Sequence, residues 1–214
     1  VLHALPVLCY NLYIIDSAFI SSACFQNTKA QKITHALFYL PIGGTIPFMK
    51  ATYKQVTKAS YIRAVSALAQ EIWAECYRRV LPGKQLKLAL EQYQSPDAIS
   101  DAMDEGVNYF LVQMGSRDVG YFAFHVTAGT VVIDHIYLKK EFRTRGLGRE
   151  ILTYCEKLAG GENLSIVNLY VPQKCQETVT YFKHRGYRPA EDVLLPVQGG
   201  ESLLCWRMEK AARF

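Results

Sequence analysis

The N-terminal region of the sequence has few charged residues. The first 48 residues carry only three charged side chains, Asp16, Lys29 and Lys32, although a fifth of the whole chain is charged. No basic segment precedes this apolar run and no clean small-residue cleavage site follows it, which argues against a secretory signal. Asp16 lies in the middle of the run at a cost of roughly 3 kcal/mol inside a bilayer, which argues against a membrane-spanning helix.

The change of composition near residue 48 predicts two regions. We expect residues 1–48 to form an apolar N-terminal extension that is poorly ordered or not part of the natural protein. Residues 49–214 are expected to form the functional domain, with Met49 near its start. A membrane-associating segment and an additional packed helical element are the alternatives for the first region.

Metal-ligand patterns are also absent. The six cysteines lie far apart, without a Cys-x-x-Cys pair or a nearby histidine at metal-ligand spacing. We therefore expect no metal site, small buried thiols and a reducing, cytoplasmic compartment. The net charge of +5 is modest and the basic residues are scattered, except for Arg143, Arg145 and Arg149. This pattern favours a local anion site over nucleic-acid binding.

The first part of the domain has a helical period. A short strand is expected at 51–57, followed by a helix with Ser60 as N-cap. Its apolar stripe, expected in the core, is Ile62, Val65, Leu68, Ile72 and Cys76. A second helix is expected at 85–94, and Ser95 followed by Pro96 predicts the start of a third.

From Val107 the period changes to that of strands, and three strands joined by tight turns are expected up to Lys140. The elements expected after them are a helix around 151–158, a strand at 164–171, a helix at 176–184, and two strands at 187–195 and 202–209 around a turn at 198–200. This order predicts an α/β fold of the α+β kind, with a mixed, mostly antiparallel central sheet and helices on both faces.

The segment Arg143–Arg149 (RTRGLGR), between the third of these strands and a helix, has the chemistry of an anion site. Gly146 and Gly148 permit backbone conformations closed to other residues, so that successive N–H groups can point into one concavity at the positive end of the helix. The segment is not a dinucleotide fingerprint, because Ile151 stands in place of the third glycine. It is not a P-loop either, because it lacks Gly-Lys-Ser/Thr.

In this context the sequence resembles the GCN5-related N-acetyltransferase (GNAT) superfamily over about residues 51–210. The resemblance is carried by the Arg-x-x-Gly-x-Gly turn after the strand Ile136-Tyr137-Leu138, by Val119-Gly120-Tyr121, by Tyr181–Tyr187 (YFKHRGY) and by Trp206–Lys210 (WRMEK). It implies the GNAT fold, acetyl-CoA as cofactor, and transfer of an acetyl group to a primary amine of a small molecule or peptide.

The resemblance also implies site residues. The main chain around Ile136, Tyr137 and Leu138 is expected to meet the acyl and pantetheine part of the cofactor. The residues implied to hold its pyrophosphate are Arg143, Thr144, Arg145, Gly146, Leu147, Gly148 and Arg149. Trp73, Glu75 and Tyr77 lie on a helical segment that often borders the acceptor pocket in this superfamily, and core packing is the alternative for Trp73.

Amine acetylation needs a base, because an alkyl ammonium with a pKa near 10.4 is only about 0.04 per cent neutral at pH 7. Strand alternation predicts that Asp134 lies on the same face as Ile136 and Leu138, beside the expected acyl group, and makes it the candidate base. A satisfied polar residue in the sheet is the alternative. His135 is expected to face the other way and to be structural.

The general acid usual in the family is a tyrosine, and Phe182 stands at its position in this sequence. Tyr181 points about 100° away on the helix, and Tyr170 is the second candidate. The asparagine usual at the start of this helix is replaced by Cys175. A non-catalytic acyl-CoA-binding module is therefore the alternative function, and a membrane-tethered protein is a third. We expect no nucleic-acid or membrane partner, and a homodimer is left open.

Overall fold

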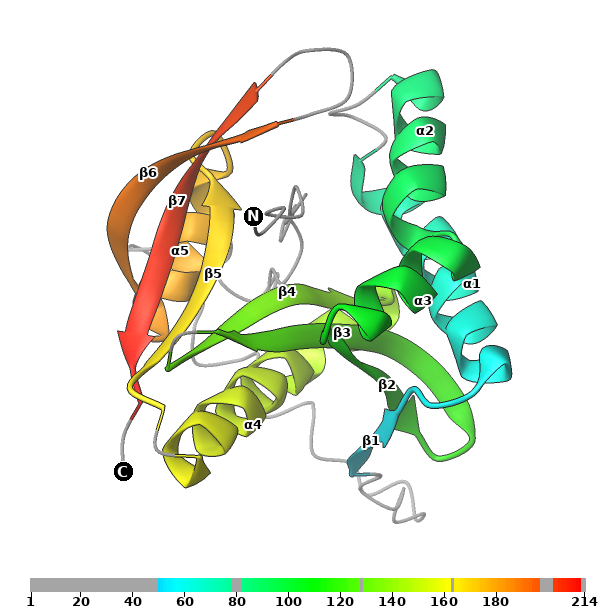
Figure 1. The fold of residues 1–214 in the computed structure, drawn as a ribbon, viewed down its shortest axis with the longest axis horizontal. Helices are drawn as coiled ribbons and strands as arrows, with labels where there is room; N and C mark the ends of the chain where they lie inside the picture. Colours follow the sequence, from blue (N-terminus) through cyan, green and yellow to red (C-terminus); the bar gives the residue numbers. More distant parts are fainter. Residues whose placement is uncertain (1–49, 78–81, 128, 163, 197–201, 213–214) are drawn as a thin grey trace, which may run out of the picture.

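The computed structural model describes residues 50–77, 82–127, 129–162, 164–196 and 202–212, and Figure 1 shows its fold. The expected extension at 1–48, the expected start at Met49 and the expected turn at 198–200 lie outside these residues.

The described strands form one seven-stranded sheet in the order β1-β2-β3-β4-β5-β7-β6. Their bounds are Ala51–Gln55 (β1), Asn108–Met114 (β2), Arg117–Thr127 (β3), Thr130–Leu138 (β4), Ile166–Pro172 (β5), Arg188–Pro196 (β6) and Ser202–Ala211 (β7). Neighbouring strands are antiparallel, except that β4 and β5 are parallel. The predicted mixed, mostly antiparallel sheet is confirmed.

Helices lie on both faces of the sheet, as predicted (Figure 1). Their bounds are Ala59–Tyr77 (α1), Gly83–Gln94 (α2), Pro96–Asp104 (α3), Lys140–Arg145 (η2, a 3-10 helix), Leu147–Gly161 (α4) and Gln176–His184 (α5). Helices α1, α2 and α3 share one core with β2, β3 and β4. Helices α4 and α5 share the other core with strands of both halves of the sheet. In the described part of the chain, no helix is both long and apolar enough to span a bilayer.

Alternation along β3 explains how one strand serves both cores. Phe122 and Phe124 lie in the core on the side of α4 and α5, which we call the α4 face. Tyr121 and Ala123 lie in the core on the side of α1, α2 and α3, which we call the α1 face. Because successive side chains of a strand point to opposite sides, these two sets follow from the sequence of β3 alone.

The helix starts were predicted with mixed success. Ser95 caps α3 as expected, since its hydroxyl oxygen accepts a hydrogen bond from the N–H of Ala98 at 3.2 Å, and Pro96 is the first helical residue. The prediction of Ser60 as the N-cap of the first helix is wrong. Helix α1 already begins at Ala59, and the carbonyl of Lys58 accepts from the N–H groups of the first turn.

Strands β4 and β5 pair over a short stretch and then separate. Three residue pairs join them, from Thr130–Ile166 to Val132–Asn168. Beyond these pairs β4 continues to Leu138 and β5 to Pro172, and the two strands diverge (Figure 1). The edge of β4 beyond Val132 is therefore not paired with β5.

Candidate active site

At the end of β4, alternate residues direct their main-chain groups toward β3 and away from it. The N–H of Lys139 donates to the carbonyl of Val119 at 2.9 Å, so in this antiparallel ladder Lys139 and Tyr137 direct their main-chain groups toward β3. Those of Ile136 and Leu138 point the opposite way, toward the side from which β5 has diverged. This orientation allows both residues to bond a ligand, in accord with their implied role.

Tyr137 has a different place. Its main-chain groups point to β3, and its side chain is buried between helix α1 and the sheet. Its hydroxyl is 2.9 Å from that of Tyr77, and its ring centroid is 5.6 Å from that of Trp73. The contact of Tyr137 with the cofactor stays a prediction, and its side chain packs the core beneath the strand.

The close approach of β3 to β4 requires a glycine. Gly120 lies opposite Leu138, and a Cβ atom added to it would lie 2.2 Å from the carbonyl oxygen of Tyr137. Any side chain at this position would displace the end of β4. Gly120, part of the motif quoted above, therefore sets the position of the strand that precedes the turn.

The turn after β4 leads directly into helix α4. Gly146 has φ of +78°, a left-handed conformation that favours glycine, and it is the N-cap of α4. The first hydrogen bond of the helix runs from the N–H of Glu150 to the carbonyl of Gly146, at 3.1 Å. The N–H groups of Leu147, Gly148 and Arg149 precede that bond, so they have no carbonyl partner within the helix. Such a helix terminus attracts anions.

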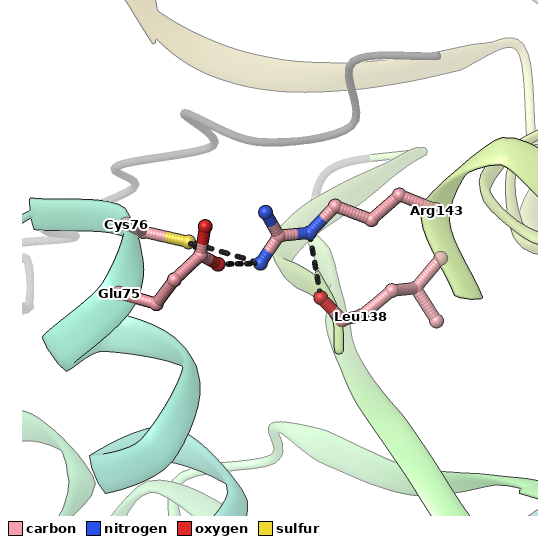
Figure 2. Close-up of polar contacts among 4 residues, drawn as sticks. All are labelled: Glu75, Cys76, Leu138 and Arg143. Carbon is pink, nitrogen blue, oxygen red and sulfur yellow. Dashed lines mark hydrogen bonds and ion pairs between the residues drawn. The ribbon is translucent and has the colours of Figure 1, made fainter. Parts of the chain in front are cut away.

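The three arginines of the turn differ in surroundings. Arg145 and Arg149 are exposed, and the guanidinium of Arg145 lies 5.0 Å from the ring centroid of Phe142. Arg143 is buried. Figure 2 shows its guanidinium reaching Glu75 and Cys76 of α1 and the carbonyl of Leu138. Thr144 lies between them in η2.

The predicted face of Asp134 is wrong. Ile133 and Ile136 both lie in the core on the α4 face although they are three residues apart, so alternation is interrupted between them. The register with β3 shifts at this point, since Ala123 pairs with His135 and Phe124 with Ile133. Asp134 is the extra residue of this β-bulge.

Asp134 instead lies on the α1 face, where it pairs with His125 of β3. The carboxylate oxygen Oδ2 is 2.9 Å from Nδ1 of His125, and the side chains are 6% and 27% exposed, respectively. Burial raises the pKa of the Asp134 carboxyl above its usual value, while the bond to His125 opposes this shift. The same bond raises the pKa of the His125 imidazole. The pair is therefore a coupled acid–base group.

His135 is structural, as predicted. Its Nε2 lies 3.2 Å from Nε2 of Gln94, whose Oε1 accepts a hydrogen bond from the hydroxyl of Tyr121. Burial lowers the pKa of the His135 imidazole to about 4, so the ring is neutral at pH 7. The residue belongs to a buried polar network on the α1 face.

The comparison with protein families decides the family. The model described as "Acetyltransferase (GNAT) domain" matches residues 77–197, which is more than half of the chain. The chain belongs to the GNAT acetyltransferase family. No curated protein sequence matches it.

Solved structures share the GNAT fold. The PaiA N-acetyltransferase from Thermoplasma acidophilum, crystallised with coenzyme A, has a TM-score of 0.63 and 16% identity, over 76% of this chain and 99% of that one. The ribosomal-protein-S18-alanine N-acetyltransferase from Escherichia coli has a TM-score of 0.58 and 12% identity, over 77% and 96%. The spermidine/spermine N-acetyltransferase SpeG from Vibrio cholerae, crystallised in mutant forms, has a TM-score of 0.54 and 13% identity, over 76% and 94%.

The two tyrosine candidates of this GNAT domain lie on opposite faces of the sheet. Leu169 and Val171 of β5 are in the core on the α4 face, so Tyr170 between them points to the α1 face, as Asp134 does. Tyr181 packs against the core on the α4 face, with its ring centroid 5.4 Å from that of the fully buried Phe182. The geometry brings Asp134 and Tyr170 to one face and leaves Tyr181 on the other.

The predicted acceptor residues lie in the core. Trp73 and Tyr77 are 0% exposed, and their ring centroids are 5.2 Å apart. Trp73 thus has the core-packing role given above as its alternative. The contact of Trp73 and Tyr77 with the acceptor stays a prediction, and in this structure neither side chain presents surface to a ligand.

Two polar residues of the α1 face escaped sequence reasoning. His125 faces Val132 across β3 and β4, and Val132 faces Asn168 of β5, so the three residues form one row across the sheet. The side chain of Asn168 is buried, and its Oδ1 has no hydrogen-bond partner among the described residues. Both polar residues could have been found in the sequence, because each is a polar residue next to core residues in a predicted strand.

Proposed function

We propose that this GNAT protein transfers an acetyl group from acetyl-CoA to a primary amine of a small molecule or peptide. The observation that carries the proposal is the N-terminus of α4, which follows the unpaired end of β4 after the short helix η2. One end of a cofactor can meet the helix terminus while its other end lies along the strand. Bound acetyl-CoA supplies an activated acyl thioester.

The residues of the chain fit such a cofactor. The orphan N–H groups of the first turn of α4, with Arg145 and Arg149 beside them, suit the pyrophosphate. The main chain of Ile136 and Leu138 suits the amide groups of the pantetheine arm, because it points away from β3. The buried and unpartnered Oδ1 of Asn168 is an acceptor available to a donor on the α1 face.

We assign the base to Asp134, with His125 as the group that sets its pKa. Asp134 is two residues beyond the last β4–β5 pair, so it lies at the point where the strands separate. It would remove a proton from the substrate ammonium, directly or through water, so that the neutral nitrogen can attack the thioester carbonyl carbon. A positioned base is typically worth about 10²–10⁴ in rate.

We assign the acid to Tyr170. When the carbon–sulfur bond of the thioester breaks, the departing thiolate needs a proton, and a tyrosine hydroxyl can supply it. Tyr170 is half-buried on the same face as Asp134. Tyr181 is less suited to this step, because it lies on the α4 face.

The acceptor class is supported by the structural relatives. Their names specify N-acetylation of spermidine or spermine in one case and of a ribosomal protein alanine in another. These acceptors are a small polyamine and a protein, respectively. At 12–13% identity these relatives indicate the shared fold, so the acceptor of this chain is proposed only at the level of a primary amine.

A second function is favoured by one observation. Phe182, at the position of the usual tyrosine, is fully buried, and Tyr181 beside it faces the α4 side. If Tyr170 does not replace the missing hydroxyl, the domain binds acyl-CoA without transferring the acyl group.

Thermal unfolding of the full chain with and without acetyl-CoA tests the proposal. A ligand at about 100 times its Kd stabilises the folded state by roughly 2.7 kcal/mol, which for this size is a rise in Tm of roughly 5–10 °C. Gly148→Glu places a carboxylate at the helix terminus and should abolish the rise.

Turnover then separates the two functions. Release of free thiol from acetyl-CoA in the presence of a broad panel of amines supports the transferase. Stabilisation without thiol release from any amine supports the binding module. No stabilisation at millimolar acetyl-CoA contradicts both.

A further inference from the structure

Arg143 begins the turn that we assign to the pyrophosphate, but its guanidinium is held elsewhere. Its Nε donates to the carbonyl of Leu138 at 2.8 Å, and its Nη2 forms an ion pair with the Glu75 carboxylate (Figure 2). The same Nη2 lies 3.5 Å from the Sγ of Cys76. The side chain is 6% exposed. One guanidinium thus connects η2, the end of β4 and the last turn of α1.

Glu75 is the charged partner in this group. Burial raises the pKa of the Cys76 thiol to about 12, so its sulfur is a neutral neighbour at pH 7. The planar guanidinium presents its donors in a fixed fork, and here different nitrogens of that fork face α1 and β4. A lysine, with a single nitrogen, could not bond both in the same geometry.

Arg145 and Arg149 have no comparable attachment. Both are exposed, and in the described part of the chain neither lies within ion-pair distance of a carboxylate. Their charge is therefore available to an anion at the start of α4, whereas a pyrophosphate would have to compete with Glu75 for Arg143.

We propose that Arg143 is a positioning residue rather than a pyrophosphate ligand: it fixes the main chain of Leu138 against the last turn of α1. In this arrangement Glu75 is part of the same device, although it belongs to a helix far away in sequence. The inference rests on the proposed function, because it concerns how the cofactor's pantetheine arm is received. It predicts that losing either residue weakens binding of that arm and leaves the phosphate contacts intact.

The test compares CoA with pantetheine, which lacks the pyrophosphate and the adenosine. Kd values for both ligands are measured at two salt concentrations for the full-length wild type, Glu75→Gln, Arg143→Lys and the double variant. Glu75 is 39% exposed, so Glu75→Gln should retain the fold. Glu71→Gln is the matched control, since Glu71 lies one turn earlier in α1 and pairs with Lys139 at 2.7 Å.

We expect each single variant to weaken CoA and pantetheine by the same factor, about three- to tenfold, as for the loss of one hydrogen bond. The double variant should be no weaker than the weaker single variant, because both changes break one group. The salt dependence of CoA binding should not change. Glu71→Gln should bind both ligands as the wild type does.

Other results overturn the inference. If Arg143 were a pyrophosphate ligand, Arg143→Lys would weaken binding of CoA but not of pantetheine, because lysine keeps the charge and loses the forked donors. Glu75→Gln would then bind CoA more tightly, because a competitor of the phosphate is gone. If the wild type binds CoA and the variants show these results, the inference is contradicted and the proposed function is not. A wild type that binds neither ligand at millimolar concentration contradicts the proposed function as well.

Discussion

The turn at Arg143–Arg149 and the polar group on the α1 face are built in opposite ways. The turn is one continuous segment, and its shape depends on a left-handed glycine and on the start of one helix. The polar group combines His125 of β3 and Asp134 of β4, nine residues apart, with Tyr170 of the more distant β5. The backbone shape of the turn thus depends on residues close to it in sequence, whereas the polar group depends on the register of three strands.

The largest expected effect is on the polar group. Asp134→Asn keeps the size of the side chain and removes the proposed base, so kcat should fall by about 10²–10⁴ while the Kd for CoA stays within threefold. Steady-state kinetics and a CoA titration measure the two quantities. If kcat is unchanged, Asp134 is the satisfied polar residue of the alternative interpretation.

The second effect concerns the turn. Arg145→Gln combined with Arg149→Gln should weaken CoA binding by about tenfold or more and make it less dependent on salt, because two charges near the pyrophosphate are lost. The double variant should leave kcat at saturating acetyl-CoA within threefold of the wild type. A fall in kcat with unchanged affinity would show that the two regions are not separable.

A smaller effect is expected in the pH dependence. Burial raises the pKa of Asp134 and His125 lowers it, so His125→Gln should move the ascending limb of kcat/KM to higher pH. His184→Gln, a change of an exposed histidine on α5, is the control and should leave the limb in place. A loss of kcat/KM by about 10²-fold or more across the pH range in His125→Gln would mean that the imidazole itself is the base.

The smallest expected effect is on stability and involves neither the turn nor the polar group. Ser95→Ala removes the N-cap of α3 and should lower the free energy of unfolding by about 1 kcal/mol. CoA affinity and kcat should be those of the wild type. Denaturant unfolding measures the change, and a change in activity would indicate that α3 influences the site.

Much of the fold could be predicted because its signals are local. The helical stripe with Val65, Leu68 and Ile72, the cap at Ser95 and the period of two in β3 each depend on neighbours in sequence. The start of α1 was missed by two residues, because Lys58 supplies carbonyl contacts that a side-chain cap rule does not detect.

The site was predicted only where it is local. The turn could be located from Gly146 and Gly148, but the face of Asp134 could not, since a bulge inserts one residue and reverses every side chain beyond it. The pairing of Arg143 with Glu75 depends on how α1 packs against β4, which no spacing in the sequence encodes. Both errors arise from contacts between distant segments.

The short parallel junction of β4 with β5 has a consequence for how the chain could be divided. Residues 50–162 supply one side of this junction and residues 164–212 the other, and the backbone passes from one side to the other once, after α4. The core on the α4 face includes residues from both sides, such as Leu152 and Phe182. Two separate polypeptides cut at this crossing would therefore share an apolar surface for reassembly, as in fragment complementation.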